Sequence, residues 1–319
     1  MKKILLMVLS TVMIMYLFTG CVQKINTSSK ANQKIKIGIC IADFNDKFMS
    51  YMLNEMKDYS QSLNNVEVQY TDAKKDSNTQ LQQVENFISQ GVDVLVVNPV
   101  DRDSTQPISD AARKAGIPIV SFNNKFNNDD DTVCSIDSDL KQSGTLEMEY
   151  LAKKANYRGN VAIIMGTMGQ EGQRLRTQAF HEVIAKYPDM KIVAEQTAEW
   201  NRSKGMALME SWLESGEDID VVACENDETA IGALTAIEQA GKLDKIFVGG
   251  IDATPDSLDY LKNGKLSVTV FPNGSGQSKA VLDNAIKVAN EEKVEKTISF
   301  PNELVIPEDA DKYIAKWKD

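Results

Sequence analysis

An alternation of short apolar runs and longer amphipathic segments extends from Ile35 through most of the chain, and it constrains the fold more than any other feature. Strands that alternate with helices in this way predict parallel sheets with right-handed crossovers. The valine-rich run Val92–Val97 indicates a central strand covered on both faces. The 319 residues hold too many strands for one doubly wound sheet of ordinary size, so we expect an α/β protein with two similar domains.

Turn residues and helix-ending glycines separate the expected elements. The expected strands are Ile35–Ala42, Val66–Tyr70, Val92–Val97, Ile117–Phe122, Val133–Ile136, Val161–Met165, Lys191–Glu195, Val221–Cys224, Ile246–Val248 and Leu266–Phe271, with short runs at Ile298 and Leu304–Ile306. The expected helices are Lys47–Leu63, Asn78–Gln90, Thr105–Ala115, Leu140–Asn156, Gln173–Tyr187, Ser203–Ser215, Asp227–Ala240 and Gly276–Glu291.

The first twenty residues have the pattern of an export signal, with a basic start and an apolar run from Ile4 to Phe18. The sequence LFTGC resembles a bacterial lipobox, in which the cysteine, here Cys21, receives lipid after cleavage, although Phe18 is unusual there. The alternative is an uncleaved anchor within residues 4–20, which is shorter than the roughly 20 residues that a spanning helix needs. In both cases we expect the polar residues 21–33 to tether the folded part outside the cytoplasmic membrane, on its extracellular face or in a periplasm.

Composition narrows the classes of ligand. The net charge is −11, and it becomes −13 without Lys2 and Lys3, which argues against nucleic acid as a partner. Three further cysteines, Cys40, Cys134 and Cys224, lie far apart in apolar contexts without a CxxC pair, so we expect small buried side chains and no disulfide framework. We expect no metal site and no cofactor.

Polar residues follow five of the expected strands, where ligands bind in open parallel sheets. They are Asp46 within the loop Asp43–Phe48, Asn98, Asn123 with Asn124, Asn226 between Glu225 and Asp227, and Asp252. Each position has an alternative interpretation as a helix N-cap, which we assign to Asp227 and to Thr254 before Pro255. Together, with amides outnumbering acids, they suit a ligand whose hydroxyls both donate and accept hydrogen bonds, whereas phosphate or carboxylate ligands would require Lys and Arg.

Two aromatic residues and one arginine fit the same interpretation. Phe48 and Trp200 lie in loops after strands, and the C–H faces of a sugar ring pack on such rings. Arg176 follows the loop GTMGQEGQ and could donate to a ring oxygen or hydroxyl. The alternatives are core positions for the two aromatic rings and a surface salt bridge for the arginine.

Several stretches resemble bacterial solute-binding proteins. GICIADFNDKFMS is similar to the opening of the periplasmic galactose/glucose-binding proteins. The stretches VDVLVVNPVD, GIPIVSFNNK, ENDETAIGALTAIEQAGK and VGGIDATPDSLDYLKNGKLSVTV resemble matching stretches across the ribose- and galactose-binding family. The resemblance is collinear from Lys34 to Ile306, which makes it far more specific than any single motif.

The resemblance implies two Rossmann-like, three-layer α/β/α domains joined by three hinge crossings, with a monosaccharide in the cleft. The crossings would lie near Ser138, Asn273 and Pro301, so that one domain comprises residues 34–138 plus 273–301 and the other 139–272 plus 302–319. The residues that match family ligand contacts are Asp46 as an acceptor from sugar hydroxyls, Phe48 and Trp200 as the aromatic pair around the ring, Asn123, Arg176, Asn226 and Asp252 as polar contacts, and Asn98 as a contact of the ribose-binding branch.

The chain departs from the family pattern at four places. Pro272 stands where an Asn or Gln usually contacts the ligand, so this contact is lost or passes to Asn273. The loop 169–172 lacks the His and Asp of galactose binders, and Asn124 stands where ribose binders have Arg. Residues 156–160 cannot supply the acidic ligands of the calcium site found in some galactose binders. These departures leave the identity of the sugar open.

The predicted function is hinge-closing capture of a hexose, pentose or inositol by a monomer that delivers it to an ABC importer. The alternative is a sensor that presents its closed form to a membrane histidine kinase or chemoreceptor. An enzyme is less favoured, because the single histidine, His181, lies on an expected helix and no Ser, Cys–His or zinc motif occurs. Asp46 with Asp252 as a glycosidase pair is the remaining enzymatic alternative. The loop 166–172 lacks the Lys-Ser/Thr of a phosphate-binding loop, and we interpret it as a ligand-lining loop.

Overall fold

The computed structural model describes residues 34–317. The predicted signal peptide, the predicted lipidation site Cys21 and the predicted tether at 21–33 lie outside the described residues. Within residues 34–317, no helix combines the length and the apolar character needed to cross a membrane.

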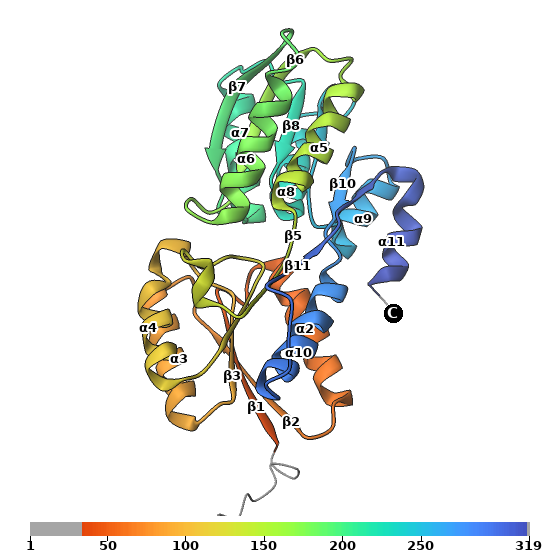
Figure 1. Cartoon of the computed structure of the whole chain (residues 1–319). Coiled ribbons are helices and arrows are strands. Elements are labelled where there is room, and N and C mark those ends of the chain that lie inside the picture. Colours follow the sequence, from red (N-terminus) through yellow and green to blue (C-terminus); the bar gives the residue numbers. More distant parts are fainter. Residues whose placement is uncertain (1–33, 318–319) are drawn as a thin grey trace, which may run out of the picture. The chain divides into compact units, whose positions relative to one another are not determined.

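Six strands form an all-parallel sheet, which we call lobe 1 together with its helices (Figure 1). In sheet order its strands are β11 (Thr297–Phe300), β5 (Cys134–Ser138), β4 (Ile119–Phe122), β3 (Val94–Val97), β1 (Ile35–Ile41) and β2 (Val66–Asp72). Helices α2 (Lys47–Ser62) and α10 (Gly274–Ala289) cover one face, and α3 (Ser77–Gln90) and α4 (Gln106–Ala115) cover the other. All four residues of β3 are buried, as the valine-rich run predicted for a central strand.

The second lobe repeats this architecture around a four-stranded parallel sheet. Its strands in order are β7 (Met190–Thr197), β6 (Gly159–Met165), β8 (Val221–Cys224) and β9 (Phe247–Gly249). Helices α5 (Leu140–Lys154) and α6 (Glu171–Ile184) cover one face, and α7 (Arg202–Glu214), α8 (Asp227–Gln239) and α9 (Pro255–Lys262) cover the other. Helix α11 (Ala310–Lys316) lies against α9, and β10 (Thr269–Phe271) pairs antiparallel with β12 (Glu303–Val305).

Sheet membership changes at three places along the chain. These places follow β5, separate β10 from α10, and separate β11 from β12. The side chain of Asn302 connects two of them, because its Nδ2 donates to the Asp139 carbonyl at 2.7 Å and to Gln142 Oε1 at 3.1 Å. The expected two-domain α/β architecture is thereby observed, with each lobe assembled from separate parts of the sequence.

Helix starts show where local sequence rules held and where they failed. Thr254 caps α9 and Pro255 is its first residue, as predicted. The assignment of Asp227 as a cap was wrong, because Asn226 caps α8 and its oxygen accepts from the Thr229 amide at 3.1 Å. Asp227 instead lies in the core, where its carboxylate accepts from the Thr254 amide at 2.9 Å.

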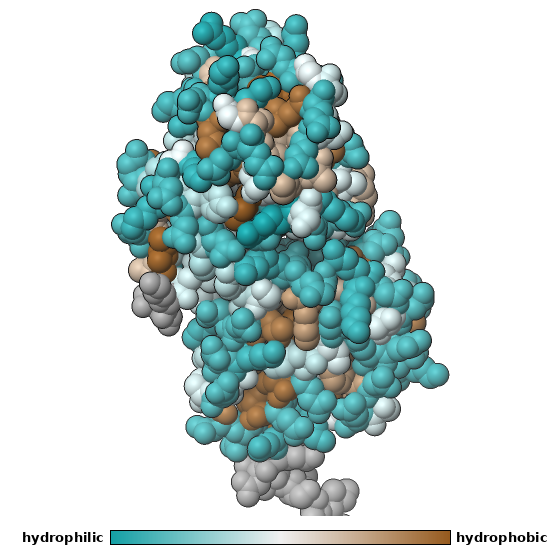
Figure 2. All heavy atoms as spheres, turned by 180° about the vertical axis from the view of Figure 1, so that it is seen from behind, coloured by the Kyte–Doolittle hydropathy of each residue, from teal (hydrophilic) through white to brown (hydrophobic). Residues whose placement is uncertain are grey.

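The structure also agrees with the expectation that the cysteines are small buried side chains. Cys40, Cys134 and Cys224 are free and fully buried, as predicted. On the face in Figure 2, hydrophilic residues predominate and hydrophobic residues show only in separate small patches. The large hydrophobic residues that are exposed within the described chain, Val133, Tyr157 and Met168, lie in three different loops. Scattered exposure of this kind is normal for a globular surface.

Candidate functional site

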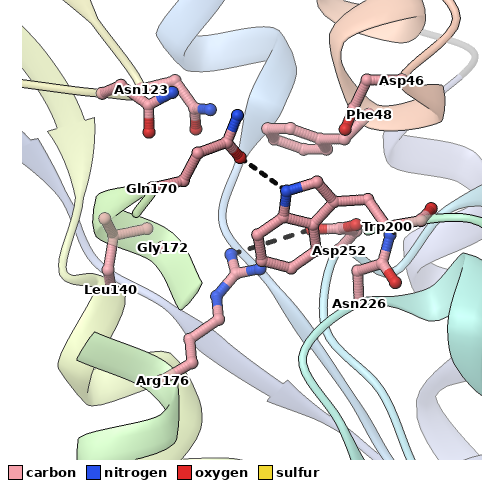
Figure 3. Close-up of a pocket in the computed structure, with 11 residues that line it drawn as sticks. Asp46, Phe48, Asn123, Leu140, Gln170, Gly172, Arg176, Trp200, Asn226 and Asp252 are labelled. Carbon is pink, nitrogen blue, oxygen red and sulfur yellow. Dashed lines mark hydrogen bonds and ion pairs between the residues drawn. The ribbon is translucent and has the colours of Figure 1, made fainter. Parts of the chain in front are cut away.

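One pocket collects side chains from both lobes at the carboxyl ends of the strands (Figure 3). Its volume, counted with its open mouth, is about 420 Å³. The lining residues are Asp46, Phe48, Asn123, Asn124, Leu140, Gln170, Gly172, Arg176, Trp200, Asn226 and Asp252. Eight of the ten residues predicted as ligand contacts therefore lie together.

Asp46 and Phe48 enter the pocket from the first turn of α2, just after β1. Asp46 caps this helix, since its Oδ1 accepts from the Met49 amide at 2.9 Å. Capping and pocket lining were alternative interpretations of Asp46, and the residue does both, because a carboxylate has a second oxygen. Burial raises the pKa of Asp46 above its ordinary value. Phe48 is 8% exposed and also belongs to the lobe 1 core.

Asn123 and Asn124 follow β4 on the same side of the pocket. Asn123 has a left-handed backbone with φ of 59°, a conformation that asparagine tolerates better than most residues. Asn124 Nδ2 donates to the Pro99 carbonyl at 3.0 Å, which leaves its side-chain oxygen available. The two residues thus supply lobe 1 with amide donors and acceptors.

Arg176 projects from α6 and is the one cation among the pocket-lining residues. Its Nη1 donates to the Glu225 carbonyl at 2.5 Å, and its Nη2 lies 3.9 Å from Asp252 Oδ1. The buried Nε has no hydrogen-bond partner within the described chain. The guanidinium also lies 5.7 Å from the ring centre of Trp200, within the range of a cation–π contact. The arginine is therefore buried at the site, and the surface salt bridge considered from sequence is excluded.

Trp200 forms the aromatic wall of lobe 2, and Figure 3 shows the other labelled side chains around its indole. The ring lies directly on Gly166, because a Cβ built at that glycine would be 1.9 Å from a ring carbon. Its Nε1 donates to Gln170 Oε1 at 2.5 Å. Gln170 in turn donates from Nε2 to the Val100 carbonyl of lobe 1 at 3.3 Å. One glutamine thus connects the aromatic wall to the opposite lobe.

Asn226 and Asp252 complete the lobe 2 side, each at the end of a strand. Asn226 uses its oxygen as the α8 cap and donates from Nδ2 to the Trp200 carbonyl at 3.3 Å. Asp252 is 4% exposed and has a φ of 123°, a strained value for a residue with a side chain. Burial raises the pKa of Asp252 well above its ordinary value, and the nearby Arg176 opposes this rise only in part. Strained backbone of this kind is concentrated at functional sites.

Two residues predicted as ligand contacts lie outside the pocket lining. Asn98 is 1% exposed, and its side chain accepts from the Ala42 amide at 3.1 Å and donates to the Phe122 carbonyl at 3.3 Å. These bonds connect the ends of three adjacent strands. Asn273 caps α10 with a left-handed backbone, accepting from the Gly276 amide at 3.1 Å. The structure gives both asparagines a backbone-holding role.

Three lining residues were not predicted as contacts: Leu140, Gln170 and Gly172. The interpretation of 166–172 as a ligand-lining loop had placed Gln170 and Gly172 in the correct region. Leu140 opens α5 directly after the change of sheet, and nothing in its own sequence distinguishes it from a core leucine.

The chemistry of the pocket combines two acids, one arginine, several carboxamides and two aromatic rings. This set donates and accepts without a large net charge, which suits a neutral molecule with several hydroxyls. Among residues 34–317, no three His, Cys, Asp or Glu side chains are grouped to hold a metal ion. His181 contacts Glu195 at the surface of α6 and does not line the pocket.

Similarity to known proteins extends over most of the chain. Residues 37–293 match the model of the periplasmic binding protein domain. A protein of Rhizobium meliloti named as rhizopine-binding is 40% identical over 275 residues, which is 84% of this chain and 89% of the relative. A xylitol-binding protein of Mycolicibacterium smegmatis is 33% identical over 81% of this chain and 72% of its own length.

A solved structure of a solute-binding protein is also similar to this chain. The crystal structure of an ABC transporter solute-binding protein from Bacillus halodurans, with bound myo-inositol, superposes with a TM-score of 0.86. The two chains are 42% identical, and the match covers 89% of this chain and 99% of the other.

Proposed function

The chain belongs to the periplasmic binding protein family, and from this premise we propose that it captures a neutral ring-shaped polyol for an ABC importer. The polyol would be a monosaccharide or a cyclitol such as inositol. The observation that carries the proposal is the convergence on one pocket of polar and aromatic side chains that follow six strands of two sheets. Relatives named for xylitol binding and solved with myo-inositol support a polyhydroxylated ligand.

A thermal-shift panel of hexoses, pentoses, inositols and linear polyols tests this function. A ligand present at about 100 times its Kd stabilises the folded state by about 2.7 kcal/mol, which raises the melting temperature by several degrees. Sugar phosphates serve as anionic controls, and we expect no shift with them because the pocket has a single cation. A panel in which no neutral polyol raises the melting temperature would contradict the proposal.

Hinge closure is the proposed binding mechanism, with boundaries at 34–138 plus 273–301 and 139–272 plus 302–319. Contacts that connect the lobes beside the pocket include the Gln170–Val100 hydrogen bond and the Arg102–Glu171 ion pair at 3.7 Å. A ligand that binds both lobes favours the closed form, because only that form offers all its partners. Small-angle scattering should show a smaller radius of gyration with ligand, and an unchanged radius would contradict closure.

We propose that the protein is exported and is anchored by lipid on Cys21 to the outer side of the cytoplasmic membrane. The motif LFTGC and the basic, apolar start of the chain support it. In the native host, Cys21→Ser should shift the protein from the membrane fraction to the soluble extracytoplasmic fraction. A variant that stays with the membrane would favour the uncleaved anchor at residues 4–20 instead.

The proposed partners are the membrane subunits of the importer, contacted by a monomer in its ligand-bound form. Crosslinking in membranes with and without ligand, followed by mass spectrometry, should recover a permease. Recovery of a histidine kinase or chemoreceptor would support the sensing alternative.

We propose no catalytic role for Asp46 and Asp252. One carboxylate oxygen of Asp46 accepts the hydrogen bond that caps α2, and Asp252 lies beside Arg176. Incubation of the pure protein with glycosides should release no sugar, and release that Asp252→Ala abolishes would favour the glycosidase alternative.

A further inference from the structure

The turn that carries Asp252 has unusual backbone geometry. Asp252 has a φ of 123° and Ala253 a φ of 48°, so two consecutive non-glycine residues lie outside the usual regions. Such a turn costs free energy and persists only where surrounding groups hold it. The position of the Asp252 carboxylate in the pocket therefore depends on what holds this turn.

Four hydrogen bonds hold the turn, and three of them come from the core of lobe 2. The Asp252 amide donates to the Val270 carbonyl at 2.8 Å, the Ala253 amide to Thr269 Oγ1 at 3.1 Å, and the Thr254 amide to Asp227 at 2.9 Å. The fourth comes from the last described residue of the chain. Trp317 Nε1 donates to the Ala253 carbonyl at 2.7 Å.

The same indole also reaches the lobe 1 wall of the pocket. Its ring lies 5.0 Å from the ring of Tyr51 on α2 and 6.1 Å from Phe271 at the end of β10, measured between centroids. A Cβ built at Gly274 would lie 3.1 Å from the Phe48 ring and 3.3 Å from the Trp317 ring, so both rings approach this glycine. Trp317 therefore packs against the cores of both lobes.

We propose that Trp317 is a positioning residue for the ligand pocket: its N–H fixes the Asp252 turn of lobe 2 while its ring supports the Phe48 side of lobe 1. Trp317 is absent from the pocket lining, so it acts through these residues. The inference rests on the proposed function, because it assigns Trp317 a role in ligand affinity.

The variant Trp317→Phe isolates the hydrogen bond, since phenylalanine keeps a ring against Tyr51 and Phe271 but has no N–H. Trp212→Phe is the matched control, because Trp212 on α7 is also partly buried and packs on the lobe 2 core. By calorimetry with the tightest polyol of the panel, Trp317→Phe should weaken binding roughly threefold to tenfold, as expected for one lost hydrogen bond. Trp212→Phe should leave the affinity unchanged.

A purely structural role for Trp317 predicts a different pattern in an Asp252→Ala background. If Trp317 acts by holding Asp252, Trp317→Phe has little further effect on affinity once the carboxylate is gone. An equal loss of affinity in both backgrounds would overturn the proposal. Unchanged affinity in Trp317→Phe alone would overturn it as well.

A ligand-free measurement separates this inference from the proposed function. Amide hydrogen exchange at Asp252 and Ala253 should accelerate in Trp317→Phe and stay unchanged in Trp212→Phe, because loosening of the turn opens both bonds. If the wild-type protein binds no polyol, the proposed function fails, and this exchange comparison still decides whether Trp317 holds the turn. Unaltered exchange would refute it.

Discussion

Asp252→Asn should weaken ligand binding and stabilise the ligand-free protein, two effects of opposite sign from one substitution. Asparagine keeps the shape of the side chain and tolerates positive φ, so the strained turn can persist. Hydrogen bonds to a charged group contribute about 1.5–3 kcal/mol, and those between neutral groups about 0.5–1.5 kcal/mol. Replacing the carboxylate by an amide should therefore cost about 1–1.5 kcal/mol of binding, which is roughly a five- to thirteenfold increase in Kd.

The stability effect follows from the pKa of Asp252. Burial raises this pKa well above its ordinary value, so the acid holds its proton more tightly in the folded chain than in the unfolded chain. The contribution of this tighter proton binding to folding stability is fully present at pH values below the pKa of Asp252 in the unfolded chain. It is lost as the pH rises toward the pKa of Asp252 in the folded chain. The wild type therefore loses stability as the pH rises above the unfolded pKa, and an amide does not incur this loss. The melting temperature of ligand-free Asp252→Asn should therefore exceed that of the wild type.

Calorimetry and thermal melts at pH 7 measure the two effects. Asp256→Asn is the matched control, since Asp256 lies at the start of the following helix and pairs with Arg202 at the surface. It should leave ligand affinity unchanged. If Asp252→Asn binds as tightly as the wild type, Asp252 does not contact the ligand. If its melting temperature falls, the carboxylate stabilises the turn and the electrostatic reasoning is refuted.

Three further predictions concern neighbouring groups. Gly166→Ala should displace the Trp200 ring, because the new Cβ would lie 1.9 Å from it. Overpacking of this kind destabilises a folded protein by about 1–3 kcal/mol. Retained affinity and an unchanged indole fluorescence spectrum would contradict this prediction. Gln170→Ala removes the hydrogen bonds to Trp200 and to the Val100 carbonyl. Each lost hydrogen bond should cost about 0.5–1.5 kcal/mol of binding free energy, measured by calorimetry. An unaltered Kd would count against this prediction. Burial raises the pKa of Glu225 from 4.5 to about 8. The stability of the wild type should therefore fall with rising pH across this interval, by up to about 1.4 kcal/mol per pH unit more than the stability of Glu225→Gln. Denaturant titrations that give parallel pH profiles for the two proteins would refute this prediction.

The fold could be predicted largely from sequence because strand and helix periodicities are local properties. Predicted and observed limits agree closely, as for the helix expected at Lys47–Leu63 and found at Lys47–Ser62. Helix α6 begins at Glu171, two residues before the predicted start at Gln173. The predicted start was later because Gly172 was assigned to the preceding loop. Helix α11 was not predicted, since seven residues are too few for a periodic pattern to be distinctive.

The site could be predicted where a polar residue directly follows a strand, because parallel strands place those ends at one edge. The same rule failed for Asn98, whose side chain spans neighbouring strand ends, since sequence does not show which way an amide points. It could not find Trp317, which reaches the Asp252 turn across 64 residues of sequence through tertiary packing alone.

The interleaving of the two lobes sets an order in which the chain can fold. Strand β11 pairs with β5, and α10 packs on α2, so lobe 1 lacks an edge strand and a covering helix until residues near 300 are available. The four strands of the lobe 2 sheet, by contrast, lie in one continuous segment between 159 and 249. Because sequence-distant contacts slow folding, a chain that emerges from its N-terminus would complete the later-synthesised sheet before the earlier one. Truncation after residue 272 would leave lobe 1 unable to close its own core.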